Sequence, residues 1–172
     1  LREAELRSAP IEPISVRHPT ADIDDAYRIQ LEGMRLRVAA GDAVRGHKVG
    51  LTARVMQKQF GVDRPDFGHL LGSMFHPEGE PLPVDALIAP RVEPEIAFVL
   101  DRPLQGPGVT VADILAATAF VLPALEVIDS RIMEWRIGIV DTVADNASSA
   151  RVVLGGTRTP IADLDPRLVG VV

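Results

Sequence analysis

The stretch Arg91-Val92-Glu93-Pro94-Glu95-Ile96-Ala97-Phe98-Val99-Leu100 decides the predicted fold. Apolar side chains recur along most of it at every second position, which is typical of a half-buried β-strand. Because the period is two, Glu93 and Glu95 fall on the same face of that strand, about 6–7 Å apart along it. Pro94 favours an edge strand or a bulge, since proline has no amide hydrogen to donate to a neighbouring strand.

These two carboxylates have two interpretations. On the outer face of an edge strand, both are solvated and need no partner. In a site shielded from water they repel each other, and a shared cation or proton is then required. A hard divalent metal is the usual cation for this purpose, because it prefers oxygen ligands and accepts several carboxylates at once.

A third carboxylate occurs in the apolar run 121–128, where Glu126 is the only charged residue. A glutamate in such a strand seldom stays buried without a partner. We therefore expect Glu126 to join Glu93 and Glu95. Three carboxylates that leave positions open for water or substrate suit Mg²⁺ or Mn²⁺ better than Zn²⁺.

Lys48 is a candidate binding residue in a strand predicted over 46–52. It lies between Gly46 and Gly50, and glycines permit the close approach of backbone or ligand. Lys48 either polarises a carbonyl or binds a carboxylate, or it extends its ammonium group to water. The sequence leaves both interpretations open.

Asp66 is a candidate catalytic residue in the turn Pro65-Asp66-Phe67-Gly68. An aspartate in such a turn commonly braces it through backbone N–H groups. In a pocket with an apolar wall, the same side chain acts as a general acid or base. These two roles exclude each other, and both remain open at this point.

Composition limits the class of protein. The 172 residues are 47% apolar and 24% charged, which is ordinary for a soluble domain with a real core. The net charge of −6 argues against a nucleic-acid binder, and no phosphate-binding glycine motif occurs. Without cysteine there is no thiolate metal site. No apolar run is long enough to span a bilayer and no signal peptide is evident, so we expect a cytoplasmic protein.

Helix signals are clearest near the beginning of the chain. Apolar residues at helical spacing predict an amphipathic helix that Thr20 caps and Gly41 ends. Thr52 is predicted to cap a short helix over 53–60. A helix over 111–120 has many small residues, which allow close packing on a sheet.

Two regions follow from this pattern. We expect residues 1–45 to form an N-terminal helical and extended region, and residues 46–172 to form a β-rich catalytic core that is incomplete at its C-terminus. Both ends of the chain look cut, because native termini are more often polar than these.

Five blocks of sequence, in this order, resemble the fumarylacetoacetate hydrolase superfamily, and within it the 2-keto-4-pentenoate (2-hydroxypenta-2,4-dienoate) hydratases of aromatic meta-cleavage pathways. The blocks are GHKVGLT (46–52), PDFG (65–68), PRVEPEIAF (90–98), LPALEVIDSR (122–131) and DTVADNAS (141–148). A single block is a weak signal, whereas five in order are specific.

The resemblance implies an α+β fold in which a mixed sheet is rolled into a barrel-like core with peripheral helices. It implies homo-oligomers, and association with a sister pathway enzyme is a further expectation. The C-terminal part of the family pattern is missing from these 172 residues.

The resemblance also implies a function. A divalent metal would bind Glu93, Glu95 and Glu126, with Lys48 and Asp66 in the pocket, and water would add to a small 2-hydroxydienoate. The related 4-oxalocrotonate decarboxylases and 2-oxohept-4-ene-1,7-dioate hydratases fit much of the same pattern. From a different class, a non-catalytic partner subunit would have no reason to keep clustered carboxylates, because like charges destabilise each other.

Overall fold

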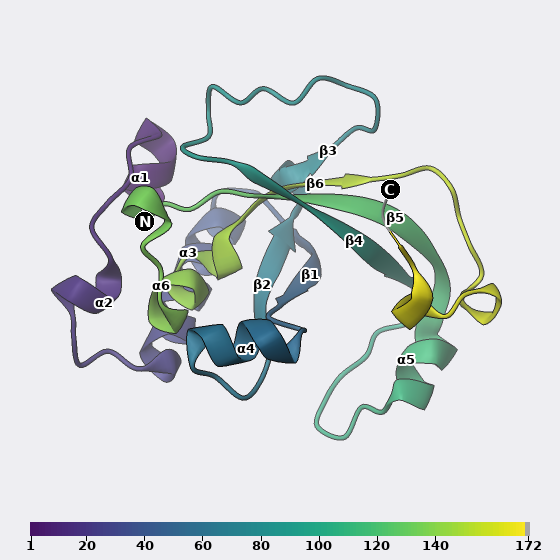
Figure 1. Cartoon of the computed structure of the whole chain (residues 1–172). Coiled ribbons are helices and arrows are strands. Elements are labelled where there is room, and N and C mark those ends of the chain that lie inside the picture. Colours follow the sequence, from purple (N-terminus) through teal and green to yellow (C-terminus); the bar gives the residue numbers. More distant parts are fainter. Residues whose placement is uncertain (171–172) are drawn as a thin grey trace.

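A computed structural model describes residues 1–170 of the chain (Figure 1). Its α-helices are α1 (Arg2–Arg7), α2 (Ile14–Arg17), α3 (Ile23–Ala39), α4 (Arg54–Phe60), α5 (Val111–Ala117) and α6 (Ile139–Ala144). Its strands are β1 (Val44–Gly50), β2 (Asp66–Leu71), β3 (Phe75–His76), β4 (Arg91–Leu100), β5 (Thr118–Ile128) and β6 (Ser149–Leu154). The 3₁₀ turn η3 (Asn146–Ser148) directly precedes β6. No helix in this described part is long and apolar enough to cross a membrane.

The strands form two sheets. Strands β1 and β2 make an antiparallel pair, and the larger sheet has the order β3-β6-β5-β4. In the larger sheet β3 runs parallel to β6, whereas β5 is antiparallel to both β6 and β4. Figure 1 shows α1, α2, α3 and α6 on one side of the molecule and α5 at the far end of the long strands. This arrangement confirms the predicted α+β class with a mixed sheet.

No barrel-like closure is found within residues 1–170, in which both sheets stay open. The larger sheet ends at β3, which has only two residues, and at β4, which contains Pro94. A barrel needs strands paired around the whole circle. A two-residue strand and a strand that contains proline are both typical of sheet edges. The edge position predicted from Pro94 is therefore confirmed.

Helix α3 is the long amphipathic helix predicted from the sequence, although its cap is Asp22 rather than Thr20. The Asp22 carboxylate accepts a hydrogen bond from the amide three residues further on, at 2.9 Å, and its charge favours the helix N-terminus. On the buried face, Gln30 donates from Nε2 to the carbonyl oxygens of Phe67 (3.0 Å) and Val143 (2.9 Å). Helix α3 is thereby tied to both β2 and α6.

Two shorter helices differ from the prediction at their boundaries. Helix α4 has Ala53 at its N-cap rather than Thr52, and it ends as predicted at Gly61, which has φ 68°. Helix α5 stops at Ala117, because the residues from Thr118 onward pair with β4. Sheet hydrogen bonds and cross-strand contacts there outweigh the helical signal. Most side chains of α5 are exposed, so the close packing on a sheet that its small residues allow is not found in residues 1–170.

The register between β4 and β5 places the three glutamates. Glu93 lies directly opposite Glu126, and Glu95 lies opposite Ala124. Residues opposite each other in a sheet share a face. All three carboxylates therefore project from one face of the larger sheet, which is the face that Lys48 of β1 approaches.

Candidate metal centre and active site

The three glutamates form one cluster. One carboxylate oxygen from each of Glu93, Glu95 and Glu126 lies within 4.8 Å of the others. Ligand oxygens around a single Mg²⁺ lie about 3–4 Å apart, given metal–oxygen distances near 2.1 Å. The upper limit of 4.8 Å in this cluster is close to that ligand spacing. The convergence predicted from the sequence is confirmed. Glu126 is only 3% exposed, whereas Glu93 is half-buried and Glu95 is exposed, so the burial of Glu126 is what requires a partner for the cluster.

The electrostatics of this cluster favour a cation. Burial raises the pKa of Glu126, although the nearby ammonium group of Lys48 opposes the rise. Partial burial raises the pKa of Glu95, and the negative charges of Glu126 and Glu93 raise it further. The buried Oε1 atom of Glu126 has no hydrogen-bond partner among the described residues. An all-oxygen donor set with an unsatisfied buried acceptor fits a hard divalent metal.

Lys48 points into the cluster. Its Nζ atom lies 3.3 Å from Oε2 of Glu126 and donates a hydrogen bond to the carbonyl oxygen of Ala147 at 3.2 Å. The side chain is 11% exposed. The alternative in which Lys48 extends to water is therefore wrong, and a shielded positive charge stands beside the carboxylates.

Asp66 begins β2 and lies beside Lys48. It is 4% exposed, and its Oδ1 atom has no hydrogen-bond partner within residues 1–170. Burial raises the pKa of Asp66, while the positive charge of Lys48 opposes this rise. A carboxylate with one free oxygen and a raised pKa is suited to proton transfer.

Gly50 makes room for Asp66. The two residues are opposite each other in the β1–β2 register. A Cβ atom at position 50 would overlap with Oδ1 of Asp66 and would lie 3.3 Å from Nζ of Lys48. Glycine at position 50 therefore leaves the space that the Asp66 carboxylate and the Lys48 ammonium group occupy. This agrees with the close approach expected at the glycines beside Lys48.

The turn η3 contributes residues that the sequence analysis did not assign to the site. The Ala147 carbonyl holds Lys48, and Ser149, at the start of β6, has a buried hydroxyl near Glu126 that lowers the pKa of that carboxyl group. The polar run 141–149 was a visible signal. Such residues usually satisfy nearby backbone groups, so sequence alone did not separate them from an ordinary turn.

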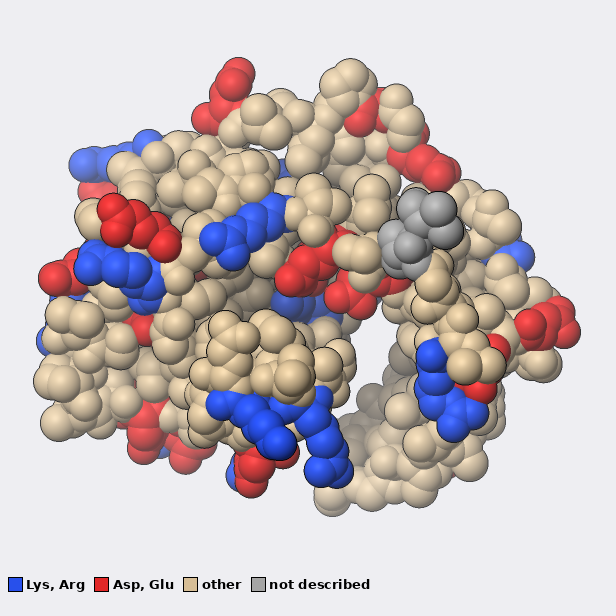
Figure 2. Space-filling view, in the orientation of Figure 1, with Lys and Arg blue, Asp and Glu red and all other residues tan. Residues whose placement is uncertain are grey.

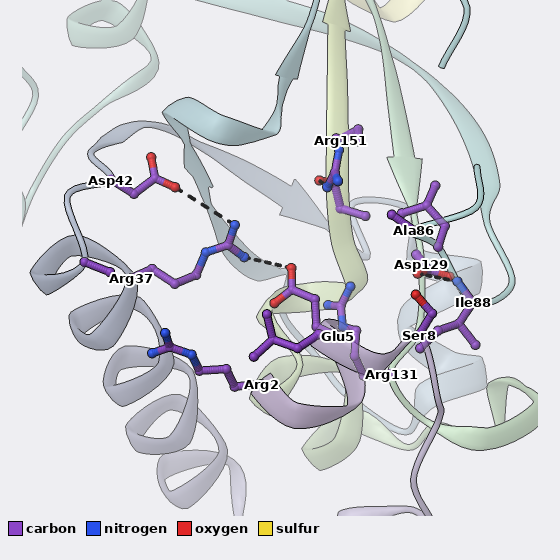
Figure 3. Close-up of a pocket in the computed structure, with 14 residues that line it drawn as sticks. Arg2, Glu5, Ser8, Arg37, Asp42, Ala86, Ile88, Asp129, Arg131 and Arg151 are labelled. Carbon is purple, nitrogen blue, oxygen red and sulfur yellow. Dashed lines mark hydrogen bonds and ion pairs between the residues drawn. The ribbon is translucent and has the colours of Figure 1, made fainter. Parts of the chain in front are cut away.

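Acidic and basic side chains meet beside a hollow on the face shown in Figure 2, next to the space between α4 and α5. A different cavity of about 450 Å³ lies between α1, the end of α3 and β6 (Figure 3). In it, Arg37 forms ion pairs with Glu5 (3.0 Å) and Asp42 (4.0 Å). None of the five predicted site residues lines this cavity in the described structure. The candidate active site is therefore the carboxylate cluster.

Comparison with known proteins shows which proteins this chain is similar to. No protein-family model matches the chain. A curated 2-keto-4-pentenoate hydratase from Burkholderia vietnamiensis is 48% identical over 165 residues, which cover 96% of this chain and 63% of that protein. A 2-hydroxypent-2,4-dienoate hydratase from Pseudomonas putida is 47% identical over 156 residues, which cover 90% of this chain and 70% of that protein.

A solved structure agrees with these relatives. The 4-oxalocrotonate decarboxylase from Pseudomonas putida G7, complexed with magnesium and adipate, superimposes with a TM-score of 0.93 at 37% sequence identity. The match covers 96% of this chain and 63% of that structure. The chain likewise spans 63% of the length of the Burkholderia relative. Fold, carboxylate cluster and sequence identity together confirm the predicted resemblance, and the chain belongs to the 2-keto-4-pentenoate hydratase family of the fumarylacetoacetate hydrolase superfamily.

Proposed function

We propose that the whole protein is a metal-dependent hydro-lyase that adds water to 2-hydroxypenta-2,4-dienoate and forms 4-hydroxy-2-oxopentanoate. The observation that carries this proposal is the convergence of Lys48 and Asp66 on a cluster of three carboxylates. Identities of 48% and 47% to two hydratases support the choice of reaction.

Glu93, Glu95 and Glu126 would hold Mg²⁺ or Mn²⁺, because both ions take carboxylate oxygens in octahedral geometry. When bound, the metal supplies a Lewis acid for the 1-carboxylate and 2-oxygen of the substrate. The two raised carboxylate pKa values in this cluster support metal binding, since a divalent cation relieves the repulsion that raises them.

Lys48 is proposed to stabilise negative charge on the 2-oxygen of the substrate. When the enol hydroxyl loses its proton, negative charge spreads from this oxygen to C5. The Lys48 ammonium is shielded from water and fixed by two partners at 3.2 and 3.3 Å. A positive charge held in this way, with little water near it, stabilises developing charge more strongly than a mobile surface lysine does.

Asp66 is proposed to move the protons. A proton is delivered to C5, which gives 2-oxopent-3-enoate. Water then adds its oxygen to C4 and a proton to C3, so one water molecule is consumed in all. Burial raises the pKa of Asp66 in spite of Lys48 and the backbone N–H groups of Gly50 and Asp66, which lower it. This raised pKa and the buried Oδ1 atom, unpartnered among the described residues, support a role in proton transfer.

Decarboxylation of 4-oxalocrotonate is the second candidate function. One observation favours it, namely the TM-score of 0.93 to a 4-oxalocrotonate decarboxylase. Sequence identity to that protein is 37%, against 48% to the hydratase from Burkholderia. Hydration is therefore the first choice.

One experiment separates the two reactions. The full-length protein is mixed with Mg²⁺ and freshly generated 2-hydroxypenta-2,4-dienoate, and in parallel with 4-oxalocrotonate. Loss of the diene absorbance with 4-hydroxy-2-oxopentanoate as the product supports the hydratase. Release of CO₂ from 4-oxalocrotonate without hydration of the dienoate would replace it by the decarboxylase.

We also propose a cytoplasmic homo-oligomer that associates with a sister pathway enzyme. Exposed apolar side chains support an interaction surface on the sheet face opposite the carboxylates. Val92 is 60% exposed, Phe98 41% and Leu125 45%. Sedimentation of the full-length protein, with and without Val92→Glu, tests the assembly.

Two structural proposals accompany this function. Residues 1–45 would serve as an N-terminal region, and residues 46–172 as the catalytic core, of which 171 and 172 lie outside the described residues. The edges β3 and β4 are where further strands would pair if the larger sheet closes into a barrel-like core. Their position at the two ends of the strand order supports this idea.

A further inference from the structure

The turn η3 holds an unfavourable backbone conformation. Asn146, Ala147 and Ser148 have φ values of 55°, 51° and 57°, and left-handed backbone is costly for alanine and serine and less so for asparagine. Three such residues in succession persist only where the surrounding structure fixes them. The contacts of this turn therefore identify the residues that hold it in this conformation and the residue that it positions.

Arg131 fixes both ends of the turn. Its guanidinium donates to Oδ1 and to the carbonyl oxygen of Asp145, each at 2.6 Å, and to the carbonyl oxygen of Ser149 at 3.3 Å. The side chains of Arg131 and Asp145 are 7% and 2% exposed. The planar, multidentate guanidinium is suited to such a bracket.

Asn146 fixes the turn to strand β2. Its Oδ1 atom accepts from the amide of His69 at 2.7 Å, and its Nδ2 atom donates to the carbonyl oxygen of His69 at 2.9 Å. This pair of bonds imitates a neighbouring strand. Gly68 allows the approach, because a Cβ atom there would lie 2.5 Å from the carbonyl oxygen of Asn146.

The docked turn then holds Lys48. Lys48 lies opposite Gly68 in the β1–β2 register, and its Nζ atom donates to the carbonyl oxygen of Ala147, the residue after Asn146. The second contact of Nζ is Glu126. The Asn146 contact to β2 is thus the direct link between the turn that carries the Ala147 carbonyl and the strand pair that carries Lys48.

We infer that Asn146 is a positioning residue, which docks the left-handed turn on β2 so that the Ala147 carbonyl holds the Lys48 ammonium group at the carboxylate cluster. Only the effect expected on turnover rests on the proposed function. The position of Lys48 is measurable without substrate.

The test uses Asn146→Gly in the full-length protein with Mg²⁺. Glycine adopts φ near 55° without strain, so the turn remains allowed while the side-chain contact to His69 is lost. The rate at which an amine-reactive reagent modifies Lys48, followed by mass spectrometry, is expected to rise about 10-fold, in line with the loss of one or two hydrogen bonds. The matched control is Glu134→Gly, another left-handed position with φ 57°, where Lys48 modification is expected to be unchanged.

Turnover supplies the second measurement. Asn146→Gly is expected to lower kcat about 10-fold with little change in KM. Because it acts through Lys48, adding it to Lys48→Met is expected to cause no further loss. A purely structural role for Asn146 instead predicts additive losses.

The outcomes distinguish the positioning role of Asn146 from the proposed hydratase function. Unchanged Lys48 modification in Asn146→Gly overturns the positioning role. Faster modification in a protein that hydrates no dienoate keeps the positioning role and overturns the proposed function. If Asn146→Gly does not fold, Asn146→Asp replaces it, because aspartate keeps the acceptor for the His69 amide while its second carboxylate oxygen replaces the donor and repels the His69 carbonyl oxygen. Unchanged Lys48 modification in that variant also overturns the inference.

Discussion

Gly50→Ala tests the geometry of the active site through a single methyl group. The new Cβ atom would overlap with Oδ1 of Asp66 and lie 3.3 Å from Nζ of Lys48. Position 50 has no left-handed backbone, so alanine introduces no backbone strain. The overlap is relieved most easily by moving the Asp66 carboxylate, which is the free end of a side chain.

The expected effects differ in size for stability and for rate. Inserting a methyl group into a packed site costs about 1–3 kcal/mol, and the higher strand preference of alanine offsets roughly 0.5–1 kcal/mol of it. A shift of about 1 Å in a catalytic group lowers turnover by roughly 10²-fold. Gly50→Ala should thus stay folded, as measured by urea unfolding, while hydration of the dienoate falls about 10²-fold.

Gly46→Ala is the matched control on the same strand. Its Cβ atom would meet only Leu70 Cδ1, at 3.9 Å, which is an ordinary contact. We expect near-normal stability and turnover. Wild-type hydration by Gly50→Ala would refute the role assigned to the gap between Gly50 and Asp66.

Four further predictions concern the same site. Glu126→Gln should weaken Mg²⁺ binding in calorimetry, because it removes the charge of one ligand. Unfolding should be nearly unchanged, because the relief of repulsion with Glu93 and Glu95 offsets the lost charge partner of Lys48. Lys48→Met should lower kcat/KM by about 10²–10³-fold in steady-state kinetics with little effect on Mg²⁺ affinity; near-normal turnover would leave Lys48 without a catalytic role. Asp66→Asn should fold and bind Mg²⁺ normally but hydrate about 10²-fold more slowly, and a wild-type rate would return Asp66 to a turn-bracing role. Without metal, the free energy of unfolding in urea should fall as pH rises from ordinary carboxylate pKa values through the raised values of Asp66, Glu95 and Glu126, because in that window the folded protein binds more protons than the unfolded chain. Mg²⁺ affinity should rise with pH over the same window. A flat pH profile of either quantity would contradict the corresponding prediction.

Local periodicity predicted the strand that carries Glu93 and Glu95 and the apolar strand that carries Glu126. It did not predict that Glu93 lies directly opposite Glu126. The register of two strands distant in sequence depends on pairing, which no local pattern encodes. The convergence of the carboxylates was instead expected from the cost of leaving each of them alone.

The remaining differences between the predicted and the observed structure also arise from contacts between residues that are distant in the sequence. Helix α5 ends three residues before the predicted boundary at 120, because pairing with β4 competes for the residues from Thr118 onward. Asn146 and its neighbours resemble an ordinary polar turn in sequence, yet their partners are His69 and Lys48, 77 and 99 residues away in the chain. Local sequence predicts the tendency of Asn to adopt left-handed backbone, but it does not predict which distant strand the side chain will bind.

The central claim is that Glu93, Glu95 and Glu126 hold one divalent metal. A crystal structure of the full-length protein with Mn²⁺, with anomalous diffraction measured at the manganese edge, tests it most directly. The account predicts one strong anomalous peak within about 2–2.5 Å of a carboxylate oxygen from each of the three glutamates. A peak ligated by other residues, or no peak at this cluster at saturating Mn²⁺, would contradict it.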